Sequence, residues 1–195
     1  MKLEKVLKRE EKNKKRFFIL MATLFFLLPL VLFLSGIKSI FILGFLGVIE
    51  ALIILCSIIK LNFYKLNFTC SNNRLRFKSG IFSKEGLLIC DKVAIVHTTK
   101  CEEDIELIIV TTINVKNKML RPIGNVFLKK YPEAAHEYLR LKNIYPDNIY
   151  YYQVIKKGAL RKYLLLDTLF KNCVRSVFTD GAIENIKISR GQSEL

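Results

Sequence analysis

The sequence predicts an α+β membrane protein, in which a hairpin of two transmembrane helices precedes an antiparallel β domain with helices at its C-terminal end. Two observations lead to this fold class. The first is a pair of long apolar segments near the N-terminus, separated by only two residues. The second is a change of hydrophobic period in the rest of the chain, first to two residues, as in strands, and later to 3.6 residues, as in helices.

The two apolar segments have the length of membrane-spanning helices. Residues 17–37 contain no charge, and residues 40–59 contain only Glu50. At 1.5 Å per residue, each segment forms a helix about 30 Å long, which matches the hydrocarbon core of a bilayer. Because only Lys38 and Ser39 separate them, we expect a tight antiparallel hairpin and not one long helix. The first segment is also too long for the core of a secretory signal peptide, so we expect it to be retained.

The basic residues around the two segments predict how the hairpin is oriented. Residues 1–16 hold eight Lys/Arg against three Glu, and the turn between the segments holds one Lys. Five more basic residues follow the second segment closely: Lys60, Lys65, Arg74, Arg76 and Lys78. Lys and Arg accumulate on the cytosolic side of membrane proteins. The sequence therefore predicts a multi-pass protein of the cell membrane with both termini in the cytosol, beside an anionic lipid surface.

The N-terminal residues 1–16 form a basic juxtamembrane segment with two interpretations. In the first, the segment extends the first helix into the headgroup region, and Leu3, Val6 and Leu7 give it a short apolar stripe among lysines, as in an interfacial helix. A disordered basic leader that only sets the topology explains the composition equally well. The sequence leaves both interpretations open.

The region from residue 60 onward alternates apolar and polar residues, which is typical of strands. Residues 66–70 and 74–78 alternate in this way around the turn 71–73. Further strands are expected at 86–90, 93–99 and 105–112, and shorter ones near 118–121 and 125–128. Pro132 then opens a helix expected at 132–142, because proline suits the first turn of a helix.

The C-terminal part of the chain predicts two more helices. Gly158 precedes a stretch, 159–178, whose apolar residues follow helical spacing and mark a buried face. Thr179 and the residues after it are expected to cap a short last helix ending near Ile188. The predicted organisation is therefore a basic segment at 1–16, the hairpin at 17–59, a β domain with its capping helix at 60–142, and a helical extension at 143–195.

Several short strings in residues 61–130 resemble the bacterial PH-like domains. The resemblance rests on these positions: Asn67-Phe68-Thr69, Asn73-Arg74-Leu75, Lys78-Ser79-Gly80-Ile81-Phe82-Ser83, Leu88-Ile89, Val93 and Val96. In membrane proteins of that family, a similar string follows a pair of transmembrane helices. The resemblance implies a PH-like β domain and a scaffold or interaction role.

The residues that usually carry chemistry are few and scattered. Five cysteines form no metal-ligand spacing, and no phosphate-binding, dinucleotide-binding or hydrolase motif occurs. His97 and His136 have no partner at metal-ligand spacing. Cys173 lies between Lys171 and Arg175, whose charges would lower its pKa, but it falls on the apolar face of the predicted helix. We therefore expect no catalytic residue, metal or cofactor, and we expect Cys173 to be structural.

A group of cations in the C-terminal region is the candidate binding surface. It consists of Lys156, Lys157, Arg161 and Lys162, close to three consecutive tyrosines at 150–152. Cations mixed with aromatic rings suit a membrane surface, a protein partner or nucleic acid. Since the chain is expected at a bilayer, the membrane surface or a protein partner is favoured, and nucleic acid is not.

Glu50 is the intramembrane polar residue, and it has three interpretations. A carboxyl group in a membrane span is costly and marks a function or a specific contact. Pro29 leaves the carbonyl of Phe25 without its helical hydrogen bond, and a protonated Glu50 at the same depth would donate to it. Alternatively, Glu50 contacts a second copy or another membrane protein, or it carries protons.

Two function classes follow from the sequence. The first is a membrane-anchored cytosolic interaction module that binds a protein partner, a second copy of itself or the anionic membrane surface. The alternative is a membrane enzyme or transporter accessory subunit that uses Glu50 or Cys173.

Overall fold

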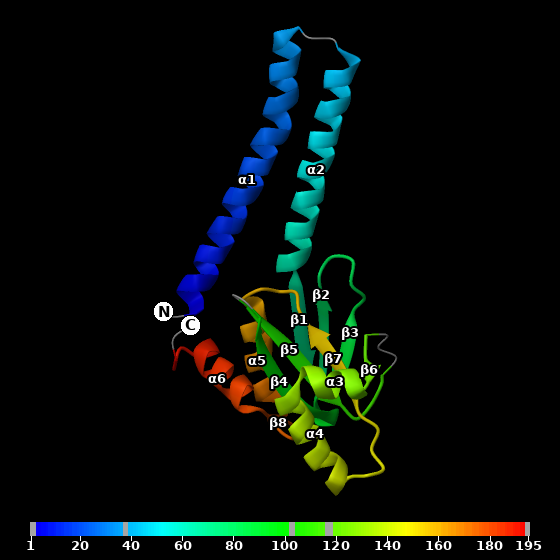
Figure 1. Cartoon of the computed structure of the whole chain (residues 1–195). Coiled ribbons are helices and arrows are strands. Elements are labelled where there is room, and N and C mark those ends of the chain that lie inside the picture. The colour runs from blue at the N-terminus through cyan, green and yellow to red at the C-terminus, as the bar shows by residue number, and fades with distance from the viewer. Residues whose placement is uncertain (1–2, 37–38, 102–103, 116–118, 194–195) are drawn as a thin grey trace.

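The computed structural model describes residues 3–36, 39–101, 104–115 and 119–193. Two long helices project from a domain in which two β-sheets pack with four shorter helices (Figure 1). The α+β class predicted from the sequence is therefore confirmed.

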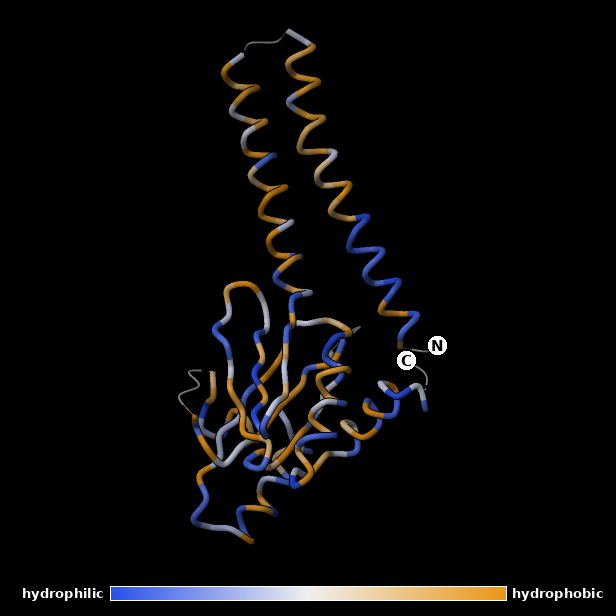
Figure 2. Tube along the Cα trace, turned by 180° about the vertical axis from the view of Figure 1, so that it is seen from behind, coloured by the Kyte–Doolittle hydropathy of each residue, from blue (hydrophilic) through white to orange (hydrophobic). Residues whose placement is uncertain are grey.

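The projecting helices are α1 (Leu3–Ser35) and α2 (Ile40–Tyr64). They run antiparallel, and both are long and apolar enough to cross a membrane by length and composition. Their apolar stretches are not buried in the structure. Figure 2 shows that the hydrophobic residues fill the distal part of both helices, whereas the half of α1 nearest the N-terminus is hydrophilic. Residues 37 and 38 of the expected turn lie outside the described residues.

The first sheet is a three-stranded antiparallel meander that follows α2 directly. It consists of β1 (Leu66–Ser71), β2 (Arg74–Ser79) and β3 (Gly86–Ile89). Asn72 and Asn73 both have positive φ, which asparagine tolerates, and they close the β1–β2 hairpin. Leu75, Phe77 and Leu88 point into the core. All three strands were predicted by the alternating pattern.

The second sheet has five strands in the order β6-β7-β5-β4-β8. Their bounds are β4 (Val93–Cys101), β5 (Asp104–Thr111), β6 (Arg121–Pro122), β7 (Tyr151–Ile155) and β8 (Val177–Phe178). A short 3-10 helix, η1 (Cys90–Lys92), links β3 to β4. The pairs of β5 with β4 and β7 and of β6 with β7 are antiparallel, whereas β8 pairs with β4 in parallel.

Four helices complete the domain, and two of them differ from the sequence prediction. They are α3 (Asn125–Lys130), α4 (Pro132–Ile144), α5 (Arg161–Asn172) and α6 (Asp180–Ser189). The helix expected at 132–142 is confirmed as α4. The prediction of a strand at 125–128 is wrong, because this stretch is helical. The helix directs Phe127 towards the core, where it packs with Tyr131.

The helix expected at 159–178 ends earlier, at Asn172. Cys173 leaves the helical region of backbone conformation. Val177 and Phe178 then pair with Ile95 and Val96 as β8. Sheet pairing at the free edge of β4 therefore overrides the helical spacing of the sequence.

The C-terminal residues are part of the same packed unit as the strands before them. One core joins Leu75 and Phe77 of the first sheet, Leu107 of the second sheet, and Leu165 and Leu169 of α5. Strand β7 lies inside the second sheet, between β5 and β6. Residues on both sides of the expected boundary at 142 and 143 therefore contribute to one core.

The junction between α2 and β1 has no flexible linker, since only Lys65 separates them. Gly80 N–H donates to the carbonyl of Lys65 at 2.6 Å, and Gly158 N–H donates to the carbonyl of Phe63 at 2.8 Å. Both glycines have positive φ, and a Cβ on Gly158 would stand 2.6 Å from Leu66. The close approach of these two loops to the end of α2 therefore requires glycine.

The N-terminal end of α1 also contacts the domain. Leu3 is 3% exposed and packs with Ile105, Tyr163 and Ile188. Residues 3–16 are therefore helical, as expected for an extension of the first helix and not for a disordered leader. They continue α1 and place its end on the domain.

His97 lies at the centre of a buried polar group between β4 and α6. It is 4% exposed, and its two ring nitrogens lie 2.9 Å from Thr179 Oγ1 and 3.0 Å from Thr99 Oγ1. Glu133 Oε2 lies 3.6 Å from Nδ1. Burial lowers the pKa of His97, and the charge of Glu133 opposes this shift only in part.

We expect acid to destabilise the domain through His97. The unfolded chain protonates this histidine near pH 6.5, whereas the folded chain does so only at lower pH. Stability is therefore complete above about pH 6.5 and falls as the pH drops below it. Thermal unfolding of the full chain in detergent between pH 7.5 and 5 measures this. His97→Gln should flatten the profile, and His136→Gln, at an exposed histidine, should leave it unchanged. An unchanged profile for His97→Gln would contradict the assignment.

Candidate functional site

The four cations predicted as one binding surface lie in three different places. Lys156 is exposed, and its Nζ lies 3.3 Å from Glu106 Oε1. Lys157 is half-buried, and its carbonyl accepts a hydrogen bond from Ser79 Oγ at 3.4 Å. Arg161 is exposed at the junction with α2 and donates from Nη1 to the carbonyl of Leu66 at 3.3 Å. Arg161 therefore lies beside the end of the helical hairpin, and Lys157 adjoins the same junction, because Gly158 N–H donates to the carbonyl of Phe63.

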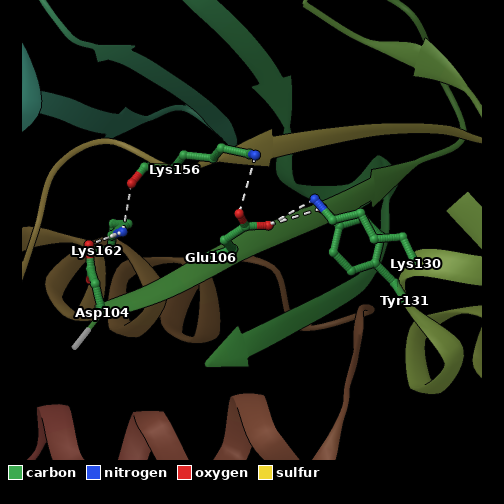
Figure 3. Close-up of polar contacts among 6 residues, drawn as sticks. All are labelled: Asp104, Glu106, Lys130, Tyr131, Lys156 and Lys162. Atoms are coloured by element: carbon green, nitrogen blue, oxygen red, sulfur yellow. Dashed lines mark hydrogen bonds and ion pairs between the residues drawn. The ribbon is translucent and has the colours of Figure 1, made fainter. Parts of the chain in front are cut away.

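Lys162 does not belong to the predicted surface, because it is 1% exposed. Its Nζ lies 2.5 Å from Asp104 Oδ2 and donates to the carbonyl of Lys156 at 2.8 Å (Figure 3). Adjacent residues of a helix differ by 100° in direction, so Arg161 faces solvent while Lys162 faces the interior. Its charge therefore stabilises the packing of α5 on β5 and is not available to a ligand.

Glu106 gathers a second set of polar groups on β5. Its carboxylate lies 3.3 Å from Lys156 Nζ and 3.6 Å from Lys130 Nζ, and it accepts from Tyr131 Oη at 3.1 Å (Figure 3). Burial acts to raise the pKa of Glu106, but the hydrogen bonds from Lys156 and Tyr131 and the charge of Lys130 outweigh it and lower the pKa. Glu106 is therefore ionised, and it holds two lysines in place.

These lysines line an open cavity of about 520 Å³. Arg121 contributes a third cation, and the rings of Tyr131 and Tyr152 form part of the wall. Burial, and then the Glu106 carboxylate, raise the pKa of Tyr131, so its hydroxyl stays protonated. With one carboxylate against three cations, the cavity favours an anionic group.

Basic and aromatic residues form a belt at the level where the apolar stretches of α1 and α2 end. Lys60 Nζ lies 5.4 Å from the ring centroid of Phe17 and 5.4 Å from that of Tyr64. Lys14 Nζ lies 5.7 Å from the Tyr64 ring. With Lys65 and Arg161 nearby, we define the basic belt by these residues: Lys14, Phe17, Lys60, Tyr64, Lys65 and Arg161.

The belt lines a second cavity, of about 320 Å³, between the ends of the two helices and the domain. Glu10 and Glu11 are its acidic residues, against Lys14, Lys65 and Arg161. Burial, and then the charge of Asp104, raise the pKa of Glu10. Cations and rings at one level are the composition found where transmembrane helices meet the headgroup region.

Glu50 lies in the middle of α2 and is half-buried. Within the described residues, no hydrogen bond joins its carboxyl group to the carbonyl of Phe25. The intramolecular interpretation of Glu50 therefore finds no support in this geometry, and contact with another chain or proton transfer stays a prediction.

Three cysteines far apart in the sequence meet in the core. Cys70 Sγ and Cys90 Sγ lie 3.9 Å apart, and Cys173 neighbours Cys90. Burial, and then Cys90, raise the pKa of Cys70 to about 11 and raise that of Cys173 further above its usual range. Thiols in this setting stay protonated and are poor nucleophiles.

The sequence analysis missed Glu106, Lys130 and Tyr131 as a group. Glu106 belongs to a strand rich in apolar residues, and Tyr131 immediately precedes the proline that opens α4. Their separation of about 25 residues is not a spacing that any short motif would detect. Only the packing of α3 and α4 on β5 brings them together.

Comparison with protein-family models, with curated proteins and with solved structures finds no match for this chain.

We expect the buried Lys162–Asp104 pair to stabilise the domain. Lys162→Met keeps the aliphatic stem but leaves the carboxylate unpaired, which should lower the free energy of unfolding by roughly 3 kcal/mol. Lys156→Met breaks an exposed ion pair and should cost less than about 1 kcal/mol. Chemical denaturation in detergent measures both. The double variant Lys162→Met/Asp104→Asn should recover part of the loss, and an additive result would contradict a direct pair.

Proposed function

We propose that this chain is a membrane-anchored interaction module of the cytosolic membrane face. In this proposal, α1 and α2 cross the bilayer, both termini are cytosolic, and the basic belt holds the domain against anionic headgroups. The cavity beside Glu106 is left open for an anionic group of a protein partner.

One observation carries the proposal: cations are grouped at the level where the apolar stretches of α1 and α2 end. The apolar stretches of α1 and α2 end at the same level, where Lys60 contacts Phe17. Lys14, Lys65 and Arg161 are grouped just beyond this level, around the second cavity. Tyrosine and phenylalanine beside lysine suit the headgroup region, and the cations suit an anionic leaflet.

A PH-like identity of the domain is part of the proposal. The order of two apolar helices followed by an antiparallel meander agrees with the resemblance in residues 61–130. The parallel strand β8 and the helix α3 are additions to that plan.

The alternative of an enzyme or transporter accessory has less support. Cys173 is fully buried, and its raised pKa disfavours the thiolate. Glu50 has neither a basic neighbour nor a hydrogen-bond partner within the described residues, so nothing there prepares it for catalysis. We therefore favour an interaction module.

Anchoring and topology are tested together. Membranes that contain the full chain should retain it after alkaline carbonate extraction. With the native cysteines left in place, Ser39→Cys should react with an impermeant maleimide in intact bacterial cells, because it begins α2 at the far side of the bilayer. Gln192→Cys should react only after the membrane is opened. Labelling of Gln192→Cys but not of Ser39→Cys in intact cells would reverse the proposed orientation.

The basic belt should make the thermal stability depend on lipid charge. In nanodiscs, the full chain should unfold at a higher temperature with phosphatidylglycerol than with phosphatidylcholine, because headgroups that bind the folded state stabilise it. Added salt should reduce the difference. Lys60→Gln/Lys65→Gln should remove most of it, whereas Lys92→Gln/Lys129→Gln, at exposed lysines elsewhere on the domain, should not. Equal losses in both double variants would mean that the belt has no special role.

A further inference from the structure

The loop between β2 and β3, residues 80–85, carries an exposed phenylalanine beside the end of α2. Phe82 is 76% exposed, whereas Ile81 and Ser83 on either side are half-buried. Figure 1 shows this loop rising to the last turn of α2, and Figure 2 shows its hydrophobic character. An apolar ring therefore stands out from the side of the domain that carries the hairpin.

The loop is braced, so the position of Phe82 is defined. Ile81 N–H donates to Asn62 Oδ1 of α2 at 2.8 Å, and Gly80 N–H donates to the carbonyl of Lys65 at 2.6 Å. Ser83 Oγ donates to the carbonyl of Ser79. Gly80 has a φ of +98°, and a Cβ there would lie 2.5 Å from Asn62 Oδ1. These contacts fix the position of the loop along the axis of α2.

That position falls in the headgroup region of a bilayer that α2 would cross. Asn62 is three residues beyond Ile59, the last apolar residue of the span, which is about 4.5 Å along a helix. The headgroup region extends about 5–7 Å beyond the hydrocarbon core on each side. A ring held at the level of Asn62 therefore lies within the headgroup region.

We propose that Phe82 inserts into the headgroup region as a third contact of the chain with the membrane, in addition to α1 and α2. The inference rests on the proposed function. The occupant of the Phe82 surface is lipid, because the neighbouring Ile81 is bound to α2 only three residues beyond the end of its apolar stretch. The charged neighbours, Lys78, Lys84 and Glu85, leave a net positive charge beside it, which suits anionic headgroups.

Insertion of Phe82 gives the loop a mechanical role. Helices α1 and α2 contact the membrane at one side of the domain, and the β2–β3 loop provides a contact at a separate point. Because the loop lies on the side of α2 away from α1 (Figure 1), its contact opposes tilting of the domain in the plane that contains the two helices. Phe82 would therefore hold the domain, and the cavity beside Glu106 with it, in one orientation to the membrane surface.

The chain contains no tryptophan, so Phe82→Trp introduces a single fluorophore with a conservative change. The full-length variant is reconstituted in vesicles of phosphatidylglycerol and phosphatidylethanolamine, with and without brominated acyl chains. The matched control is Val174→Trp, at an apolar residue that is 85% exposed and follows the end of α5. Figure 1 shows α5 leading away from the junction with α2, so this position is remote from the membrane.

The expected result is a blue-shifted emission for Phe82→Trp, with several-fold stronger quenching by brominated lipid and weaker quenching by aqueous iodide than for Val174→Trp. If vesicles carry the protein on flotation but iodide reaches both tryptophans equally, the inference is wrong and the anchoring stands. If Phe82→Trp is shielded from iodide but not quenched by brominated lipid, a protein surface covers it, and the lipid assignment is overturned. If the chain does not float with vesicles, the proposed function and this inference both fail.

Discussion

The junction between α2 and β1 is the constraint on which the rest of the structure depends. A helix passes into a strand through the single residue Lys65, and backbone hydrogen bonds from Gly80 and Gly158 fasten two loops to the helix end. Leu3 fastens the other helix to the domain at a separate point. Because neither helix is joined by a flexible linker, the direction of the hairpin determines the direction of the domain.

Polar contacts inside the domain also fix the positions of side chains. Asp104 and Glu106 are two residues apart on β5, so they share one face of the strand. Asp104 pairs with Lys162 of α5, whereas Glu106 is close to Lys130 and Lys156. Each carboxylate positions cations that come from distant parts of the chain. Two of those cations, Lys130 and Lys156, also line the cavity of about 520 Å³.

Much of the fold could be predicted from local patterns. The two apolar segments, the meander from Leu66 to Ile89 and the helix opened by Pro132 all have strong signals of period or composition. The failures are residues 125–128 and 173–178, where short apolar runs suit a helix and a strand alike. In both places tertiary packing decided between helix and strand. Phe127 packs with Tyr131 in a helix, and Val177 pairs with the edge of β4 in a strand.

The candidate site, too, was predicted only in part from the sequence. The sequence by itself determined the apolar helices and the basic residues that flank them, because hydropathy and charge are properties of continuous segments. The tertiary structure alone decided that Lys162 is buried, that Arg161 and Lys14 line one cavity, and that Ile81, next to Phe82, is bound to Asn62. The physical reason is that burial and proximity depend on which surfaces pack together, and residues separated by many positions carry no local record of that choice.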